Sequence, residues 1–203
     1  KDGASTASAE KSAITVAAAI NAVADLSGVH AVVNTNFVGG TTVSTSVTAS
    51  AAAITINNKA ITLSGSGVAD NLAADLAGVA AAINAFSGET GVKAVFDKNN
   101  LDAGVSLLAE DGRNIVIAGA TAADYGLQAA GTYTGTYTLV SRDGSDITIG
   151  STTGNSKENA GIEVGTYSGN NSGANGGAVT GAISAGDLTI NGISIGPSLS
   201  SYD

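Results

Sequence analysis

Ala17-Ala18-Ala19-Ile20-Asn21-Ala22 recurs unchanged as Ala80-Ala81-Ala82-Ile83-Asn84-Ala85, at an offset of 63 residues. The match continues without a gap, because Gly28-Val29-His30-Ala31-Val32 aligns with Gly91-Val92-Lys93-Ala94-Val95. Across residues 17–34 and 80–97, 10 of 18 aligned positions are identical. A match of this length within one chain predicts an internal repeat whose copies fold as the same supersecondary unit.

Each copy of the repeat predicts a helix, a turn and a strand. Apolar residues at steps of three and four line one face of a helix, whereas alternating apolar residues line one side of a strand. We expect Asp70 to cap the second helix and Ser87-Gly88 to end it. The helical stripes are Leu72, Leu76, Val79, Ile83 and Phe86, and, in the first copy, Ala13, Val16, Ile20 and Val23. The inward strand positions are Val92, Ala94 and Phe96, and Val29, Ala31 and Val33; Lys93, Val95 and Asp97 face the other side.

A hairpin also occurs twice. Ile54–Ile61 is predicted to form two short strands around Asn57-Asn58, and Leu188–Ile195 to form the same hairpin around Asn191-Gly192, a favoured type I′ turn. The middle copy has the order hairpin, helix, strand. The first helix has no hairpin before it and the last hairpin has no helix after it, so we expect the chain to be an excised piece of a longer protein.

Further strand pairs are predicted at 105–109 with 114–118, and at 132–141 with 146–150. The segments between them both contain Asp-Gly, which predicts hairpin turns. We expect a short strand at Ile162–Tyr167 and a mobile loop over Asn170–Gly177. A boundary near Gly131 then separates a helix-containing lobe with two repeat units (1–131) from a strand- and loop-rich lobe that ends in the first hairpin of a further unit (132–203).

These elements together predict an α+β, β-dominated fold, in which hairpins and small antiparallel sheets pack with two Ala-rich helices. A chain of 203 residues can bury a sizeable core. Because aromatic residues make up only 4% and Trp, Met and Cys are absent, that core consists mainly of Ala, Val, Ile and Leu. The 28 glycines and single proline predict many tight turns.

The charge balance excludes some partners. The formal net charge of -9 repels polyanions, so we expect no nucleic acid and no anionic membrane as a partner. The lack of cysteine rules out disulfides and thiolate metal sites. No run of residues approaches 18 apolar positions, and the first residues show no signal-peptide pattern.

Candidate catalytic groups are few. His30 is the only histidine, and it aligns with Lys93 on the polar side of a predicted strand, so we expect a surface residue rather than a base. A carboxylate pair for glycoside hydrolysis is conceivable among four acidic residues, although a turn explains the last of them better. These four are Asp97, Asp102, Glu110 and Asp111. We therefore predict no enzyme, and assign no catalytic, cofactor-binding or metal-binding residue.

Other motifs have two interpretations each. Arg142–Asp146 suggests calcium ligation but lacks the EF-hand spacing, so a turn is the better account. Gly65-Ser66-Gly67 before a helix could cradle an anion, but no lysine lies at the appropriate spacing, so a flexible helix entry is the better account. Asn170-Asn171-Ser172 is a formal N-glycosylation sequon, although a chance match in an Asn-rich loop is the better account. A carbohydrate-stacking patch is conceivable, with Tyr133 and Tyr137 on one side of a strand, but half-buried sheet residues are the better account of Tyr125, Tyr133, Tyr137 and Tyr167.

Ile54–Ile61, Leu72–Phe86 and Gly91–Val95 together resemble the IN motif of bacterial flagellins, whose pattern runs as I-T-I-N-G-x-x-I, a spacer, L-x-x-I-N-A and t-G-V-x-A. Leu188–Ile195 resembles the start of a further copy and 17–34 the end of an earlier one. Leu107–Ile115 is similar to an a-x-D-G-R-N-I stretch of flagellin outer domains. The resemblance covers about half of the chain, and 132–181 lies outside it.

The resemblance implies a structural, surface-exposed outer domain (D2/D3-type) of a flagellar filament protein, extracellular and without catalysis or cofactors. The partners it implies are other flagellin subunits, through terminal regions absent here, and antibodies or host surface glycans. Flagellins are exported without a cleaved signal, and their outer domains often carry O-linked sugars, for which Ser and Thr of 151–184 are candidates. The filament-cap protein also carries IN motifs, so a cap domain or an adhesin-like glycan-binding domain is the alternative.

Overall fold

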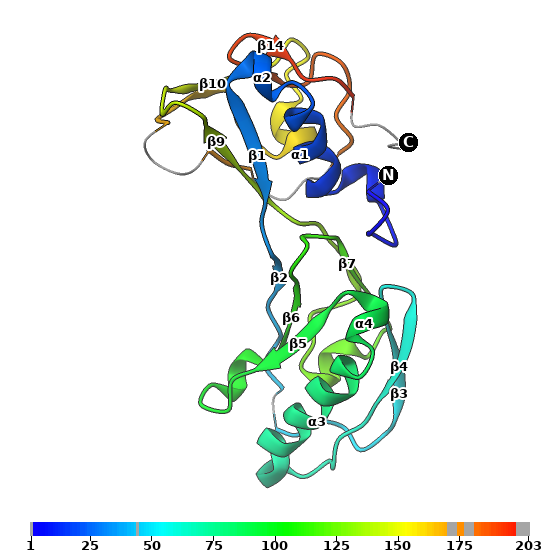
Figure 1. Ribbon diagram of the computed structural model, residues 1–203. Helices are drawn as coiled ribbons and strands as arrows, with labels where there is room; N and C mark the ends of the chain where they lie inside the picture. The colour runs from blue at the N-terminus through cyan, green and yellow to red at the C-terminus, as the bar shows by residue number, and fades with distance from the viewer. Residues whose placement is uncertain (1, 44, 170–173, 177–180, 198–203) are drawn as a thin grey trace. The chain divides into compact units, whose positions relative to one another are not determined.

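The computed structural model describes residues 2–43, 45–169, 174–176 and 181–197. The fold is α+β and rich in small antiparallel sheets, with helices α1 (Ala13–Asn21) and α3 (Leu72–Asn84) as the two longer helices, which confirms the predicted class. The chain forms two compact units (Figure 1). Unit 1 comprises Lys1–Thr35, Asp111–Asn114 and Thr134–Asp203, and unit 2 comprises Asn36–Glu110 and Ile115–Tyr133.

Unit 2 contains two antiparallel sheets and helix α3, which contacts β4, β5 and β6. The first sheet has the order β2-β6-β5 and the second β4-β3-β7-β8. The four-residue helix α4 (Ser87–Thr90) follows α3. The strands are β2 (Asn36–Val38), β3 (Ala52–Ile56), β4 (Lys59–Leu63), β5 (Lys93–Phe96), β6 (Val105–Ala109), β7 (Ile115–Ala118) and β8 (Gly131–Tyr133).

Unit 1 repeats this plan with other segments. Its sheets have the orders β1-β9-β12 and β11-β10-β13-β14, and α1 contacts β1 and β9. The four-residue helix α2 (Ala24–Ser27) follows α1. The strands are β1 (Val29–Val33), β9 (Tyr137–Ser141), β10 (Ile147–Gly150), β11 (Gly165–Tyr167), β12 (Ala174–Gly176), β13 (Thr189–Ile190) and β14 (Ile193–Ser194).

The strand registers show that the two units are copies of one fold. Ala94 on β5 pairs with Leu107 on β6, and Ala31 on β1 pairs with Leu139 on β9. In the second sheets the same correspondence holds for Ile56–Ile117 and Ile190–Ile149. In both copies a Gly-Thr-Tyr strand lies at the edge of the second sheet, and the pair Ile115–Tyr133 corresponds to Ile147–Tyr167.

The predicted boundary near Gly131 was wrong. The N-terminal helix and strand belong with the C-terminal part of the chain, because β1 pairs with β9 and the buried face of α1 shares one apolar cluster with it. That cluster includes Val16, Ile20, Leu139, Ile149, Leu188 and Ile190. The second cluster, in unit 2, has no residue in common with the first. Burial of apolar faces, rather than nearness in sequence, therefore sets the division.

The predicted helical stripes and strand alternation are confirmed. Leu76, Val79 and Ile83 are buried, and Leu72 and Phe86 pack against them. The hairpins also form as predicted. Both residues of the Asn57-Asn58 turn have positive φ, at 45° and 68°, and the Asn191-Gly192 turn has 49° and 79°. These values are those of a type I′ turn, which matches the twist of the paired strands.

The two Asp-Gly segments are not hairpin turns, contrary to the prediction. Strands β6 and β7 lie in different sheets, and so do β9 and β10, so each segment carries the chain from one sheet to the other. Only Gly112 and Gly144 have positive φ there, whereas a type I′ turn requires it at two successive residues. The preceding Asp111 and Asp143 instead accept the backbone N–H of Arg113 and Ser145. The predicted strand 132–141 likewise divides into β8 and β9.

The ends of helix α3 also differ from the prediction. Asp70 lies in a 3-10 turn, Ala69–Asn71, and does not cap the helix, whose N-cap residue is Asn71. Ser87-Gly88 begins α4 rather than ending the helical segment. Gly91, with φ 69°, ends it, as Gly28, with φ 71°, ends α2. No helix among the described residues is both long and apolar enough to cross a membrane.

Candidate functional site

The asparagines of the repeated motif build the same set of side-chain hydrogen bonds in each unit. At the end of α3, Asn84 accepts the Ala94 N–H at 2.8 Å and donates Nδ2 to the Ala94 carbonyl at 2.8 Å. Asn21 at the end of α1 makes the same pair of bonds with Ala31, at 2.8 and 3.0 Å. The Asn of each INA sequence thus joins the helix end to the neighbouring strand.

The hairpin asparagines, Asn57 and Asn191, also bridge two backbone groups each, and we call such a bridging asparagine side chain a clamp. Oδ1 of Asn57 accepts the Val116 N–H at 2.8 Å, and Nδ2 donates to the Thr90 carbonyl at 2.9 Å. Asn191 makes the equivalent bonds to Thr148 N and Ser27 O, at 2.8 and 2.9 Å. Each asparagine therefore joins the hairpin, the adjacent strand and the end of the short helix.

The short helices that receive these clamps also match in detail. Thr90 Oγ1 donates to Phe86 O at 3.0 Å and accepts the Val92 N–H at 3.1 Å. Ser27 Oγ donates to Val23 O at 3.1 Å and accepts the Val29 N–H at 3.3 Å. Because buried backbone groups without partners are costly, these contacts explain why the motif needs a hydroxyl residue before its glycine.

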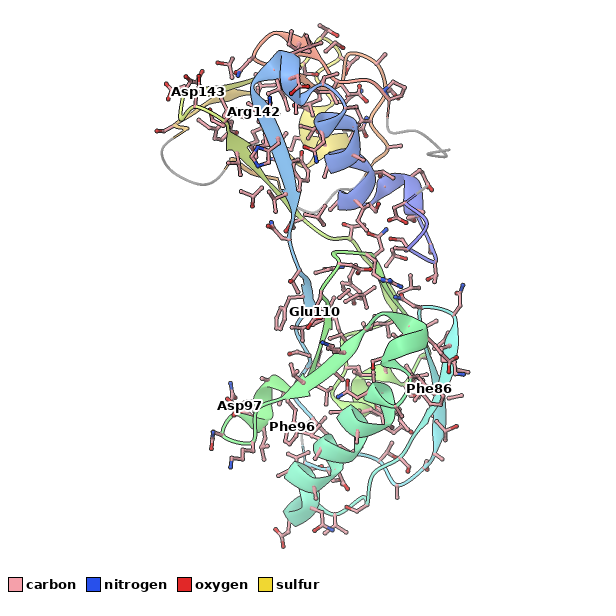
Figure 2. All side chains as sticks on the ribbon, viewed as in Figure 1. Phe86, Phe96, Asp97, Glu110, Arg142 and Asp143 are labelled. Atoms are coloured by element: carbon pink, nitrogen blue, oxygen red, sulfur yellow. The ribbon has the colours of Figure 1, made fainter. Side chains whose placement is uncertain are left out.

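The predicted catalytic candidates do not form a site. His30 is half-buried on β1, opposite Val140, at the position that Lys93 has in unit 2. Figure 2 shows Asp97 and Glu110 at opposite ends of the β5–β6 pair. Glu110 pairs with Lys93 at 2.6 Å, and Asp97 accepts the Asn99 N–H. Asp102 lies in the 3-10 turn Leu101–Ala103, apart from these contacts.

Asp111 forms an ion pair with Arg113 at 2.6 Å, within the segment that joins β6 to β7. Burial opposes ionisation of this carboxyl group, but the hydrogen bonds and charge of Arg113 outweigh burial and lower its pKa. A carboxylate held in this way suits a structural turn rather than proton transfer. Asp143, labelled in Figure 2, occupies the equivalent position and accepts from Ser141 Oγ and Ser145 N at 3.0 Å.

The glycine-rich segment before α3 does not leave its N–H groups for an anion. Ser66 N and Oγ donate to Oδ2 of Asp75, at 3.0 and 2.8 Å, so a carboxylate of the chain already lies there. Gly65 N and Gly67 N donate to carbonyls of Thr48 and Val47. Among the described residues, no group of three or more His, Asp or Glu could hold a metal ion.

The four tyrosines do not make a common stacking patch. Tyr125 and Tyr137 are 1% and 0% exposed, and Tyr137 donates to Ala160 O at 2.7 Å. This burial raises the pKa of Tyr137 well above its ordinary value. Tyr133 and Tyr137 lie on separate strands of different units, not on one side of a strand. Tyr133 on β8 and Tyr167 on β11 are half-buried sheet residues, whereas Tyr137 is fully buried and Tyr125 lies in a 3-10 turn, Ala122–Tyr125. The sequon at Asn170–Ser172 lies outside the described residues.

Two features were not predicted. Unit 2 has a hollow of 330 Å³ lined by Thr42, Val43, Thr45, Ser46, Thr48, Ala123 and Asp124. Unit 1 has a buried carboxylate, Asp187, 1% exposed, that accepts from Thr153 Oγ1 at 2.6 Å, Asn159 Nδ2 at 2.7 Å and Ser184 N at 2.8 Å. No sequence motif marks either one, because their residues are common turn and loop types.

Neither a scan against protein-family models nor a search of curated protein sequences returns a match to this chain.

Proposed function

We propose that the chain is a structural, non-catalytic outer domain of a flagellar filament protein, exposed on the extracellular surface of the filament. The proposal rests on the IN-like motif. Its asparagines, Asn57 and Asn84, hold a hairpin, a helix end and two strands together, and Asn191 and Asn21 do the same in unit 1. A motif whose polar residues serve the fold is what a repeated structural module requires.

The resemblance gains support from contacts between parts of the motif that are far apart in the sequence. Hairpin β13–β14 and the helices α1 and α2 lie near opposite ends of the chain, yet Asn191 donates to Ser27 O at the end of α2, so together they complete one module. A polar, acidic surface also suits a subunit exposed to solvent. On this proposal the partners are other flagellin subunits, reached through regions outside this chain, and antibodies that bind its surface.

Antibodies raised against the 203-residue chain test this proposal on filaments of the source bacterium. We expect electron microscopy to show antibody along the whole shaft. The matched control is the same serum after adsorption on the purified chain, which should remove the label. Absence of label from intact filaments, with retained binding to the purified chain, would contradict the proposal.

A cap domain or an adhesin-like glycan-binding domain is the alternative. Label confined to the filament tip would favour the cap. The hydroxyl-lined hollow beside Asp124 favours a glycan, because hydroxyl and carboxylate groups are hydrogen-bonding partners for sugars. A glycan array probed with the wild-type chain and with Asp124→Ala distinguishes this case, since binding that depends on Asp124 would support the adhesin-like function.

A further inference from the structure

The turn of hairpin β13–β14 carries an unusual combination of features. Asn191 and Gly192 are both exposed, with φ 49° and 79°. A Cβ atom placed on Gly192 would have no neighbour within 4 Å, so the turn is open to solvent. The equivalent clamp residue in unit 2, Asn57, is only 5% exposed and is followed by Asn58 rather than by glycine.

An Asn-Gly pair has a characteristic covalent chemistry. The backbone nitrogen of the glycine gives up its proton and attacks Cγ of the asparagine. A C–N bond forms, the bond from Cγ to Nδ2 breaks, and the NH2 group takes up a proton and leaves as ammonia. Water then opens the five-membered succinimide to give aspartate or isoaspartate. Glycine favours this step because it has no side chain to obstruct the approach of its nitrogen and its backbone is conformationally free.

We propose that Asn191 is a site of spontaneous deamidation, and that opening of the β13–β14 hairpin controls the reaction. In the closed hairpin, Oδ1 accepts the Thr148 N–H at 2.8 Å and Nδ2 donates to Ser27 O at 2.9 Å. The amide is held on both sides, so Cγ cannot turn towards the Gly192 nitrogen. Both bonds must break before attack, which makes the rate depend on the open fraction of the hairpin.

Aspartate or isoaspartate at position 191 holds the β13–β14 hairpin less firmly than Asn191 does. An aspartate at 191 retains an acceptor for the Thr148 N–H but loses the donor to Ser27 O, and places a charged oxygen against that carbonyl. Isoaspartate also lengthens the backbone inside a two-residue turn. The ladder between β13 and β10 is short, because it pairs only Ile190 with Ile149 and Thr189 with Gly150, and one further backbone bond runs from Asn191 N to Thr148 O. Deamidation is therefore an irreversible change that weakens unit 1 and not unit 2.

To test the proposal, the intact chain is aged in mildly alkaline buffer at physiological temperature. It is then digested, and its peptides are measured by mass spectrometry. We expect the peptide with Asn191 to gain the mass of deamidation several-fold faster than the peptide with Asn57. The rate at Asn191 should rise in urea too dilute to unfold the protein. The other Asn-Gly pair is Asn175-Gly176 on β12, and cleavage at Asp187 places it on a different peptide from Asn191.

Asn58→Gly is the matched variant, because φ of Asn58 is already 68° and glycine adopts it without strain. It creates an Asn-Gly pair at the buried clamp. We expect Asn57 in this variant to react more slowly than Asn191 in native buffer and at the same rate in fully denaturing urea. If Asn191 deamidated no faster than Asn57 of the wild-type chain, Asn191 would not be a deamidation site of the kind proposed. If its deamidation rate did not change in dilute urea, opening of the hairpin would not control the reaction.

Discussion

Units 1 and 2 have the same sheets and the same asparagine clamps, but the chain builds them differently. Unit 2 uses one nearly continuous segment, Asn36–Tyr133, interrupted only by Asp111–Asn114, and its hairpin, helix and strand follow one another. In unit 1 the helix and strand come first and the hairpin comes last. The comparison shows that complementary apolar faces and clamps, rather than chain order, determine which elements assemble.

The two hairpins are held unequally. Strands β3 and β4 pair over five positions, from Ala52–Leu63 to Ile56–Lys59, whereas β13 and β14 pair over two. The clamp at Asn57 is buried and the one at Asn191 is exposed. We therefore expect unit 1 to be the less stable copy, and the following predictions test this difference.

The largest effect should come from deleting equivalent core side chains. Ile83→Ala and Ile20→Ala each remove a fully buried isoleucine, at 0% exposure, and should lower the free energy of unfolding by about 2–5 kcal/mol. Because the two apolar clusters share no residue, each change should accelerate hydrogen exchange only in peptides of its own unit. Urea unfolding followed by hydrogen-exchange mass spectrometry measures both quantities. Equal acceleration in both units after either change would show that the units unfold together.

A smaller and unequal effect should follow loss of the hairpin clamps. Asn57→Ala leaves Thr90 O and Val116 N buried without their partner, and should cost about 1–3 kcal/mol. At the exposed position water can replace the lost amide, so Asn191→Ala should cost only about 0.5–1.5 kcal/mol. Thermal unfolding of both variants tests the order, and a larger loss at Asn191 would reverse our ranking of the clamps.

The glycines that end the short helices should have similar, moderate effects in the two units. Gly91→Ala and Gly28→Ala force a Cβ atom into a left-handed conformation and should each cost about 1–2 kcal/mol. The cost at Gly28 does not come from a steric clash with neighbouring atoms, since a Cβ atom there would meet nothing within 4 Å. Gly78→Ala is the matched control, because Gly78 lies in the interior of α3 with the same open space. That change should stabilise the protein by about 0.5–1 kcal/mol, as a glycine-to-alanine change in a helix does.

The sequence predicted the pieces well where their periodicity was local. The helical stripes that contain Ile83 and Ile20, the two hairpins and the fold class all follow from spacing within about 25 residues. Pairings between distant segments were not predicted, because β1 with β9 and β10 with β13 depend on burial in the folded chain. One signal was available: 106–117 and 138–149 share five of 12 residues, including Asp-Gly, and Gly-Thr-Tyr follows in both copies.

Of the residues that form the candidate site, the sequence predicted only those that belong to the repeated motif. The sequence identified the asparagines of the hairpins and of INA as part of a repeat, but not their partners, since Val116 and Thr148 contribute backbone groups that any residue supplies. The Asp-Gly segments were mispredicted because the same dipeptide serves a two-residue hairpin and an Asx turn. Asp187 had no sequence signal, since its partners Thr153 and Asn159 precede it by 34 and 28 residues and belong to no recognisable motif.

The smallest effect should be an acid sensitivity specific to unit 1. The pKa values of Asp2, Asp111, Asp143, Glu163 and Asp187, all in unit 1, lie below their ordinary values. At Asp187 burial opposes ionisation, but hydrogen bonds from Thr153, Ser184 and Asn159 outweigh it. The stabilisation from a lowered carboxyl pKa is complete above the ordinary value, 3.8 for Asp, and is lost as the pH falls through the folded value.

We therefore expect the thermal midpoint of unit 1 to fall as the pH is lowered below about 4, the ordinary range of Asp. Asp187→Asn should lower the midpoint at neutral pH, because the amide is a weaker acceptor for the three donors, and should make the remaining pH dependence shallower. Asp124→Asn in unit 2 is the control and should leave the acid transition of unit 1 unchanged. If Asp187→Asn preserved the full pH dependence, the buried carboxylate would not be a source of the acid sensitivity, and the difference between the units would rest on the hairpins alone.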